Sequence, residues 1–331
     1  MKAANFAALL ERFFTDRLLR QREASPHTIA SYRDTFRLLL QFAQRRLRKP
    51  PSRLSLEEID APLITAFLDD LEANRRISAR SRNHRLTAIR SFFHYISYEE
   101  PAHAHQIQRV LAIPGKRFAK TLVQFLNRAE VDALLGAPDQ HAWHGRRDYA
   151  LLLLALQTGL RLSELTAVRS RDLHLGTGAH VRCVGKGRKE RCTPLAKQTV
   201  KVMKTWMQES APGADDWLFC TTRRARLSPD AVQDLLDKHR IIAAQACPSL
   251  AKKRVTPHVL RHTLAMELLQ AGVDRSVIAL WLGHESVETT QIYLDANLAL
   301  KEQILAKVGT CKSKYRRFQA EDALLAFLKS L

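Results

Sequence analysis

Apolar positions recur at the spacing of an α-helix through most of residues 1–99. The stretch 25–47 shows this most clearly, because Ser25 is a good N-cap residue and Pro26 suits the first helical position. A second apolar stripe runs through 78–97. The pattern predicts a helical first part of the chain, with helices over 25–47, from about Pro62, and over 78–97.

The pattern in the second part is mixed. The segment 146–173 predicts an apolar helix that breaks at Thr158–Gly159, followed by a helix capped by Ser163. Further on, a helix that starts at Thr256 ends at Gly272. Between them, a three-stranded antiparallel meander is predicted over 172–175, 179–185 and 190–195. We therefore expect a mainly α fold with a small antiparallel β-sheet, in the α+β class.

A break in periodicity separates the two parts. Pro101, Pro114 and Gly115 interrupt the pattern, and it resumes after Asn127, where Glu130 is placed for a capping box. We expect a helical domain at 1–99, a linker at 100–122, a mixed domain at 123–310, and a linker with a short helix at 311–331.

The final stretch, 320–331, regains helical periodicity with a crowded apolar side. A helix this short is marginal alone, so its apolar face has to dock. It docks either on its own domain, as is usual for terminal helices, or in the groove of a neighbouring identical protomer.

The charge balance indicates a polyanionic partner. Lys and Arg total 53 against 33 Asp and Glu, a formal net charge of +20 that is spread over both parts of the chain. Nucleic acid is the commonest such partner, and the alternative is a merely soluble basic surface. The basic residues lying mostly off the apolar stripe of 78–97, or at the end of the linker, are candidate DNA contacts, although a solvated helix face explains the first group equally well. These candidates are Arg80, Arg82, Arg85, Arg90, Lys116, Arg117 and Lys120.

Several other classes of function are disfavoured. No apolar run approaches the roughly 18 residues of a membrane span, so we expect a cytoplasmic protein with no membrane partner. The five cysteines form no C-x-x-C pair, and Cys183 and Cys192 face each other across the predicted hairpin as free thiols. We predict no metal site and no cofactor.

Tyr293 stands in the stretch 282–296, LGHESVETTQIYLDA, nine residues after His284. On a helix capped by Ser286, it falls about 120° from the apolar stripe at 100° per residue. A core aromatic is therefore disfavoured, which leaves a surface tyrosine or a nucleophile.

Four further residues could contact an anion. Arg161 follows the helix break in TGLRLSEL, and Lys186 lies in the glycine-flanked turn VGKGRKER. In HVLRH, His258 and Arg261 are neighbours on one helix face. Each residue also has an explanation without function. Lys186 fits an ordinary exposed lysine of a hairpin, and His258 fits a solvated first helical turn. A zinc-protease motif is disfavoured because Val259 stands where a glutamate is needed.

The ordered combination of these motifs resembles the tyrosine recombinase, or phage integrase-like, family. The resemblance covers at least residues 123–298, and the helical first part looks like that family's core-binding domain. Glu164, in the Arg-x-Ser-Glu turn, matches the family's supporting acidic position. The implied catalytic set is Arg161, Lys186, His258, Arg261, His284 and the nucleophile Tyr293.

The resemblance implies a site-specific recombinase that cuts and rejoins double-stranded DNA through a 3′-phosphotyrosine and a Holliday junction. The two domains would close round the duplex as a clamp, with a dimer on each site and a tetramer in synapsis. The mobile-element functions, namely integration, excision or transposition, are the favoured biology. Two alternatives are a type IB topoisomerase-like nicking–closing enzyme and a DNA-binding protein without catalysis. The target sequence, the direction of reaction and accessory factors are left open.

Overall fold

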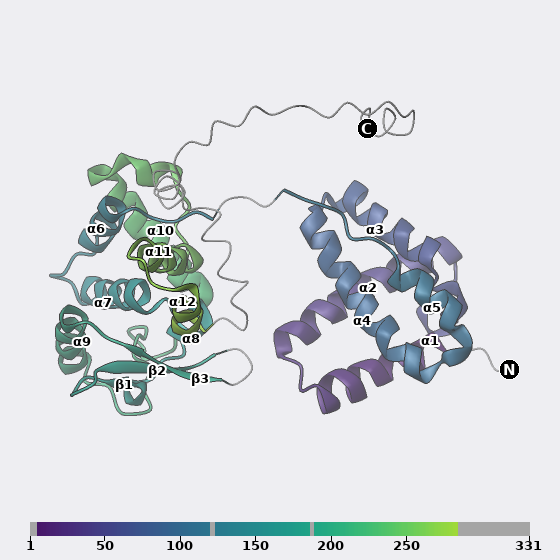
Figure 1. The fold of residues 1–331 in the computed structure, drawn as a ribbon, viewed down its shortest axis with the longest axis horizontal. Coiled ribbons are helices and arrows are strands. Elements are labelled where there is room, and N and C mark those ends of the chain that lie inside the picture. Colours follow the sequence, from purple (N-terminus) through teal and green to yellow (C-terminus); the bar gives the residue numbers. More distant parts are fainter. Residues whose placement is uncertain (1–4, 120–122, 186–188, 284–331) are drawn as a thin grey trace, which may run out of the picture. The chain divides into compact units, whose positions relative to one another are not determined.

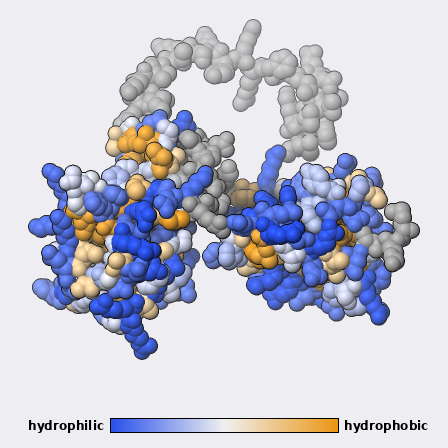
Figure 2. Space-filling view, turned by 90° about the horizontal axis from the view of Figure 1, so that it is seen from below, coloured by the Kyte–Doolittle hydropathy of each residue, from blue (hydrophilic) through white to orange (hydrophobic). Residues whose placement is uncertain are grey.

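A computed structural model describes residues 5–119, 123–185 and 189–283. It divides into two compact units, Met1–Lys120 and Thr121–Leu331 (Figure 1). Of the described helices, none combines the length and apolar character that crossing a membrane requires. Hydrophilic side chains cover most of the visible face of each unit (Figure 2).

The first unit is helical, and its hydrophobic core is centred on a cluster of phenylalanine side chains. Phe92 is fully buried, and its ring centroid lies 5.3 Å from that of Phe6, 5.5 Å from Phe13 and 5.4 Å from Phe36. Such edge-on aromatic contacts add to the area that burial removes from water. The elements that supply this core are α1 (Phe6–Arg12), a π-helical turn (Phe13–Gln21), α2 (Pro26–Leu47), α3 (Ala61–Arg75), α4 (Ala79–Glu99) and α5 (Ala104–Leu111).

The start of the expected linker is instead part of this core. Residues 100–122 include α5, and Ile107, Val110 and Ile113 are all buried in the first unit. These three positions recur every third residue, a helical signal that the prolines on either side obscured. Helix α5 ends at Leu111, and residues 113–119 carry no regular secondary structure.

The second unit combines helices with a small sheet, of which one face is packed and the other is exposed. The strands β1 (Leu173–His174), β2 (His180–Val184) and β3 (Glu190–Pro194) form an antiparallel sheet in the order β1-β2-β3, which confirms the predicted meander. The α-helices in its described residues are α6 (Arg128–Gly136), α7 (Trp143–Thr158), α8 (Leu162–Leu165), α9 (Lys197–Ser210), α10 (Pro229–Ala246), α11 (Pro257–Gln270) and α12 (Arg275–Leu282).

Local sequence signals place most helix starts correctly. The side chains of Ser25, Asn127 and Thr256 each accept the capping hydrogen bond at the N-terminus that was predicted for them. The expected Ser163 cap is wrong, because α8 begins two residues earlier with Arg161 at the N-cap. The Glu164 carboxylate accepts the Arg161 backbone N–H, which satisfies that end of the helix.

The two hairpin thiols do not face each other. Cys183 pairs in register with Arg191, whereas Cys192 pairs with Arg182. Because side chains alternate between the two faces of a strand, Cys183 is buried and Cys192 is exposed. Both are free cysteines, as expected.

The chain is fastened where it enters the second unit. Lys253 donates to the Phe125 carbonyl over 3.0 Å and to the buried Glu130 carboxylate over 2.7 Å. The Leu126 N–H donates to the hydroxyl of Thr263 on α11. This short stretch is therefore tied to α11 and to Lys253, which follows the 3₁₀ turn Pro248–Lys252 and also binds α6.

Candidate active site

Arg161 is positioned by a tight turn between α7 and α8. Gly159 ends α7 with φ +62°, a left-handed conformation that glycine adopts without strain. A Cβ at this position would lie 2.6 Å from Leu282 Cδ2 and 3.0 Å from Leu264 Cδ2, so the glycine also permits close packing. The Arg161 side chain leaves this turn 27% exposed, which keeps part of it accessible to a ligand.

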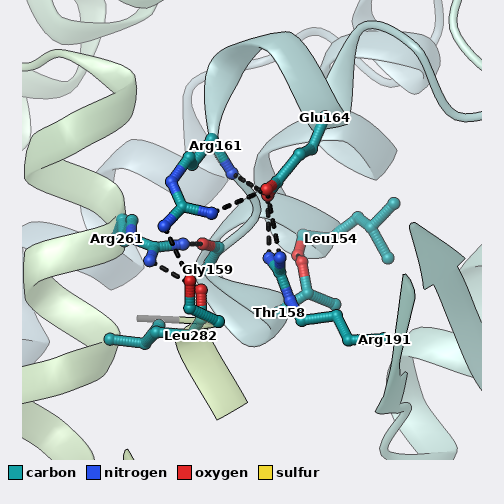
Figure 3. A network of polar contacts seen from close by, with 9 residues as sticks. Leu154, Thr158, Gly159, Arg161, Glu164, Arg191, Arg261 and Leu282 are labelled. Carbon is teal, nitrogen blue, oxygen red and sulfur yellow. Dashed lines mark hydrogen bonds and ion pairs between the residues drawn. The ribbon is translucent and has the colours of Figure 1, made fainter. Parts of the chain in front are cut away.

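Glu164 is the centre of a buried ionic network (Figure 3). Its side chain is only 3% exposed and accepts from the Arg161 backbone N–H (2.7 Å) and Nη1 (2.8 Å). Arg191 on β3 donates Nη1 to Oε1 over 3.0 Å and Nη2 to Oε2 over 2.7 Å. Burial alone raises the pKa of Glu164, but the hydrogen bonds from Arg191 and the Arg161 backbone outweigh it and lower the pKa to about 2.

Arg261 approaches the same region from α11. Its guanidinium is buried and donates Nη1 to the Gly159 carbonyl over 2.5 Å and Nη2 to the Leu282 carbonyl over 2.6 Å. Arg161 Nη2 donates to the neighbouring Gly283 carbonyl over 2.8 Å. The Leu282 and Gly283 carbonyls lie at the C-terminus of α12, where a helix leaves acceptors unpaired and a cation is favoured. The two arginines therefore converge on one helix end.

Two histidines of α11 stack beside Arg261. The ring centroids of His258 and His262 are 6.2 Å apart. The pKa of His258 is lowered by partial burial and then by the charges of Arg261 and Arg161. Burial, followed by the electrostatic interactions with His258 and then with Arg261, lowers the pKa of His262 to about 4. Both shifts favour the neutral imidazole, which can accept a proton.

The structure thus brings together Arg161, Glu164, Arg261 and His258, four of the seven residues predicted for the site. Lys186, His284 and Tyr293 lie outside the described residues. The glycines that precede two of them are described, however. A Cβ added to Gly185 would lie 3.3 Å from Glu164 Oε1, and a Cβ added to Gly283 would lie 2.7 Å from Arg191 Nη1.

The predicted basic face of α4 is only partly exposed. Arg80 is exposed, but Arg82 is 4% exposed and lies 3.4 Å from the Glu72 carboxylate. The expectation that Arg82 faces solvent is therefore wrong, because a partner on α3 draws it inward. Arg85 donates to Thr35 Oγ1 over 3.0 Å.

Arg90 is also engaged within the first unit, where it donates to the Ile113 carbonyl. Lys116 forms an exposed ion pair of 2.6 Å with Glu72, and Arg117 is exposed. Lys120 lies outside the described residues. Within the described ranges, no group of three or more His, Cys, Asp or Glu side chains is arranged to hold a metal ion.

Sequence reasoning missed Arg191. Its signal was present, because Arg191 pairs with Cys183 and occupies an inward position of β3. A charged residue at an inward strand position needs a buried partner of opposite charge. Glu164 is that partner. The resemblance to the family implies a supporting role for Glu164 but names no basic partner on the sheet.

Comparison with known proteins places the chain in a family. Residues 124–299 match the family described as "Phage integrase family", and residues 10–100 match "Phage integrase, N-terminal SAM-like domain". The "Putative integrase/recombinase y4rC" of Sinorhizobium fredii is 65% identical over 330 residues, covering 100% of this chain and 99% of that protein. "Tyrosine recombinase XerC" of Pelobacter propionicus is 33% identical over 289 residues, covering 87% and 90% respectively.

Solved structures share the fold. The post-cleavage complex of the XerH site-specific recombinase with its difH substrate superposes with a TM-score of 0.70 at 22% identity, covering 86% of this chain and 81% of that one. The Tn1549 transposon integrase bound to transposon right-end DNA gives 0.67 at 14% identity, covering 90% and 99%.

The chain belongs to the phage integrase family of tyrosine recombinases, enzymes that cleave and rejoin DNA. The predicted family, enzyme class and α+β fold are confirmed. The topoisomerase and the non-catalytic alternatives find no support.

Proposed function

We propose that this chain exchanges DNA strands at a specific site through a covalent bond to Tyr293. The Tyr293 hydroxyl loses its proton and attacks the scissile phosphorus. The bond from phosphorus to the 5′-oxygen breaks, leaving a 3′-phosphotyrosine and a 5′-hydroxyl. Because the phosphotyrosine keeps the energy of the cleaved bond, a 5′-hydroxyl from the partner duplex rejoins the strand without a nucleotide or a metal.

The convergence of Arg161 and Arg261 carries this proposal. Two guanidinium groups that meet at one helix end can donate to the non-bridging oxygens of a phosphate and stabilise the charge that grows in the transition state. Glu164 orients Arg161 through two hydrogen bonds. Both arginines are held by protein carbonyls, so little reorganisation is needed when DNA arrives.

The remaining residues manage protons. The lowered pKa of His258 keeps its imidazole neutral, so that it can accept the proton that Tyr293 loses. His284 donates to a non-bridging oxygen. Lys186 protonates the departing 5′-oxygen as general acid, and Gly185 beside it lies against the Glu164 carboxylate.

DNA binding and assembly follow from charge and family. The +20 net charge suits double-stranded DNA, and the two units would close round it as a clamp. The proposed phosphate contacts outside the active site are Arg80, Arg85, Arg90, Lys116, Arg117 and Lys120. We propose a dimer on each site and a tetramer in synapsis, as solved structures describe for lambda integrase on a core site and on a Holliday junction.

The biological setting is the movement of a mobile element. The name of the 65% identical relative contains "integrase", and one structural neighbour is a transposon integrase. The reaction would take place in the cytoplasm, at the nucleoid.

The Tyr293→Phe variant tests the proposal. On a nicked suicide substrate, which traps the covalent intermediate, wild type should form a protein–DNA adduct and Tyr293→Phe should form none. The DNA affinity of the two should agree, because the change removes one oxygen. An adduct formed by the Phe variant would exclude Tyr293 as nucleophile.

A further inference from the structure

Arg191 is one of the two arginines that bind Glu164, yet the proposed chemistry gives it no role. It is on β3, its side chain is 12% exposed, and it donates to both oxygens of Glu164 (Figure 3). A bidentate pair of this kind fixes orientation as well as distance. Since Glu164 also accepts from Arg161, a single carboxylate connects Arg191 to Arg161.

The charges of these three residues do not cancel. Two guanidinium groups share the one negative charge of Glu164, so the cluster carries a net charge of +1. Without Arg191, Glu164 would neutralise Arg161 completely. Two acceptor positions of the carboxylate would also become available to the N–H groups of Arg161. Because the Glu164 side chain is 3% exposed, water screens these effects weakly.

Arg191 also supports the backbone beside the two arginines. A Cβ on Gly283 would lie 2.7 Å from Arg191 Nη1, and one on Gly185 would lie 3.3 Å from the same atom. The Gly283 carbonyl is the acceptor of Arg161 Nη2. The Arg191 guanidinium therefore packs against the same turn that Arg161 binds.

We propose that Arg191 is a positioning residue that keeps Arg161 oriented and net positive toward the scissile phosphate, by taking up the charge and the acceptor positions of Glu164. This inference rests on the proposed role of Arg161. It predicts that the effect of an Arg191 substitution on the rate of DNA cleavage depends on Arg161 and on the charge of the scissile phosphate.

The first test compares two substrates in single-turnover cleavage at saturating protein. Arg191→Met should slow cleavage of an ordinary phosphodiester about 10- to 100-fold, the scale of one charge-assisted hydrogen-bond pair. On a methylphosphonate substrate, in which a methyl group replaces one charged oxygen, the losses of both Arg191→Met and Arg161→Ala should shrink. The same loss on both substrates for Arg191→Met would overturn the proposal, because a merely structural defect is indifferent to phosphate charge.

The second test restores the charge balance. In the double variant Glu164→Gln with Arg191→Met, Arg161 again stands in a cluster of net charge +1. Cleavage should therefore be faster than in Arg191→Met alone. A double variant that cleaves no faster would contradict the inference. Arg191→Lys, which retains the charge without the bidentate geometry, should fall between wild type and Arg191→Met, and it serves where Arg191→Met folds poorly.

Arg182→Met is the matched control. Arg182 lies on the neighbouring strand β2, and its side chain is 46% exposed in an ion pair of 3.1 Å with Asp172. It should cleave both substrates at rates near wild type. The outcomes also separate the two proposals: if Arg161→Ala cleaves normally, the proposed function fails, whereas if only Arg191→Met cleaves normally, the positioning role alone fails.

Discussion

The Arg261 guanidinium donates to the carbonyl oxygen of Gly159 over 2.5 Å, across 102 residues of sequence. This bond joins α11 to the turn that ends α7, and both partners are buried. The same guanidinium reaches the end of α12 through Leu282. Three segments that carry separate motifs in the sequence are therefore held together by one side chain.

Substitution of either arginine should slow DNA cleavage, whereas only substitution of Arg261 should also lower the free energy of unfolding. Arg161→Ala and Arg261→Ala should each slow cleavage by about 10² or more, the scale for losing one oxyanion donor. Arg261→Ala should also destabilise the fold by about 1–3 kcal/mol, because it leaves buried carbonyls unpaired. Single-turnover cleavage and urea unfolding measure the two effects.

Arg128→Ala provides the control for both measurements. Its side chain is 76% exposed in an i,i+4 pair with Asp132, so neither cleavage nor stability should change much. Wild-type cleavage by Arg161→Ala or Arg261→Ala would remove that residue from the site.

Gly159→Ala should be more destabilising than a matched glycine substitution. Gly178 also has positive φ, +72°, but no atom lies within 4 Å of its Cβ position. Gly178→Ala should cost about 1–2 kcal/mol from the left-handed backbone alone. Gly159→Ala adds a clash with Leu282 and Leu264 and should cost a further 1–3 kcal/mol.

Tryptophan fluorescence during urea unfolding measures this difference in the second unit. All four tryptophans lie in that unit, at positions 143, 206, 217 and 281. Equal costs for the two variants would mean that the close packing at Gly159 relaxes freely.

The stability of the second unit should fall as pH drops from 6.5 to 4. The folded state holds His262 at a pKa of about 4, below the ordinary value of 6.5, so the unfolded chain binds the proton more readily. Its contribution is therefore complete above pH 6.5 and is lost on acidification, at up to about 1.4 kcal/mol per pH unit for one proton. Unfolding of wild type and His262→Gln across this range should show the dependence weakened in the variant. A constant difference between the two would refute it.

Removal of residues 320–331 should impair assembly and spare single-site binding. These residues lie outside the described part of the chain, so the expectation rests on their amphipathic sequence. Wild type and truncation should bind one-site DNA alike, while cooperative binding and synapsis on two-site DNA weaken. A truncated protein that assembles and recombines normally would mean that this segment docks on its own domain or has no role in assembly.

The sequence predicts elements better than it predicts partners. Caps such as Ser25 and Thr256 are local signals, and the structure confirms them. The expectation that Arg82 is exposed fails because helical periodicity separates apolar from polar positions within one helix. It does not show that Glu72 on the adjacent helix lies close enough to pair with Arg82. Arg191 was overlooked for the same reason: its importance depends on Glu164, which lies 27 residues away in the chain.

The fastening at Phe125, Leu126 and Glu130 has a mechanical consequence. Tension along the backbone from the first unit would act on a segment that is held by hydrogen bonds. It meets Lys253 at the Phe125 carbonyl and Thr263 at the Leu126 N–H. Thr263 is two residues beyond Arg261 on the same helix, so the force is delivered within one helical turn of that guanidinium.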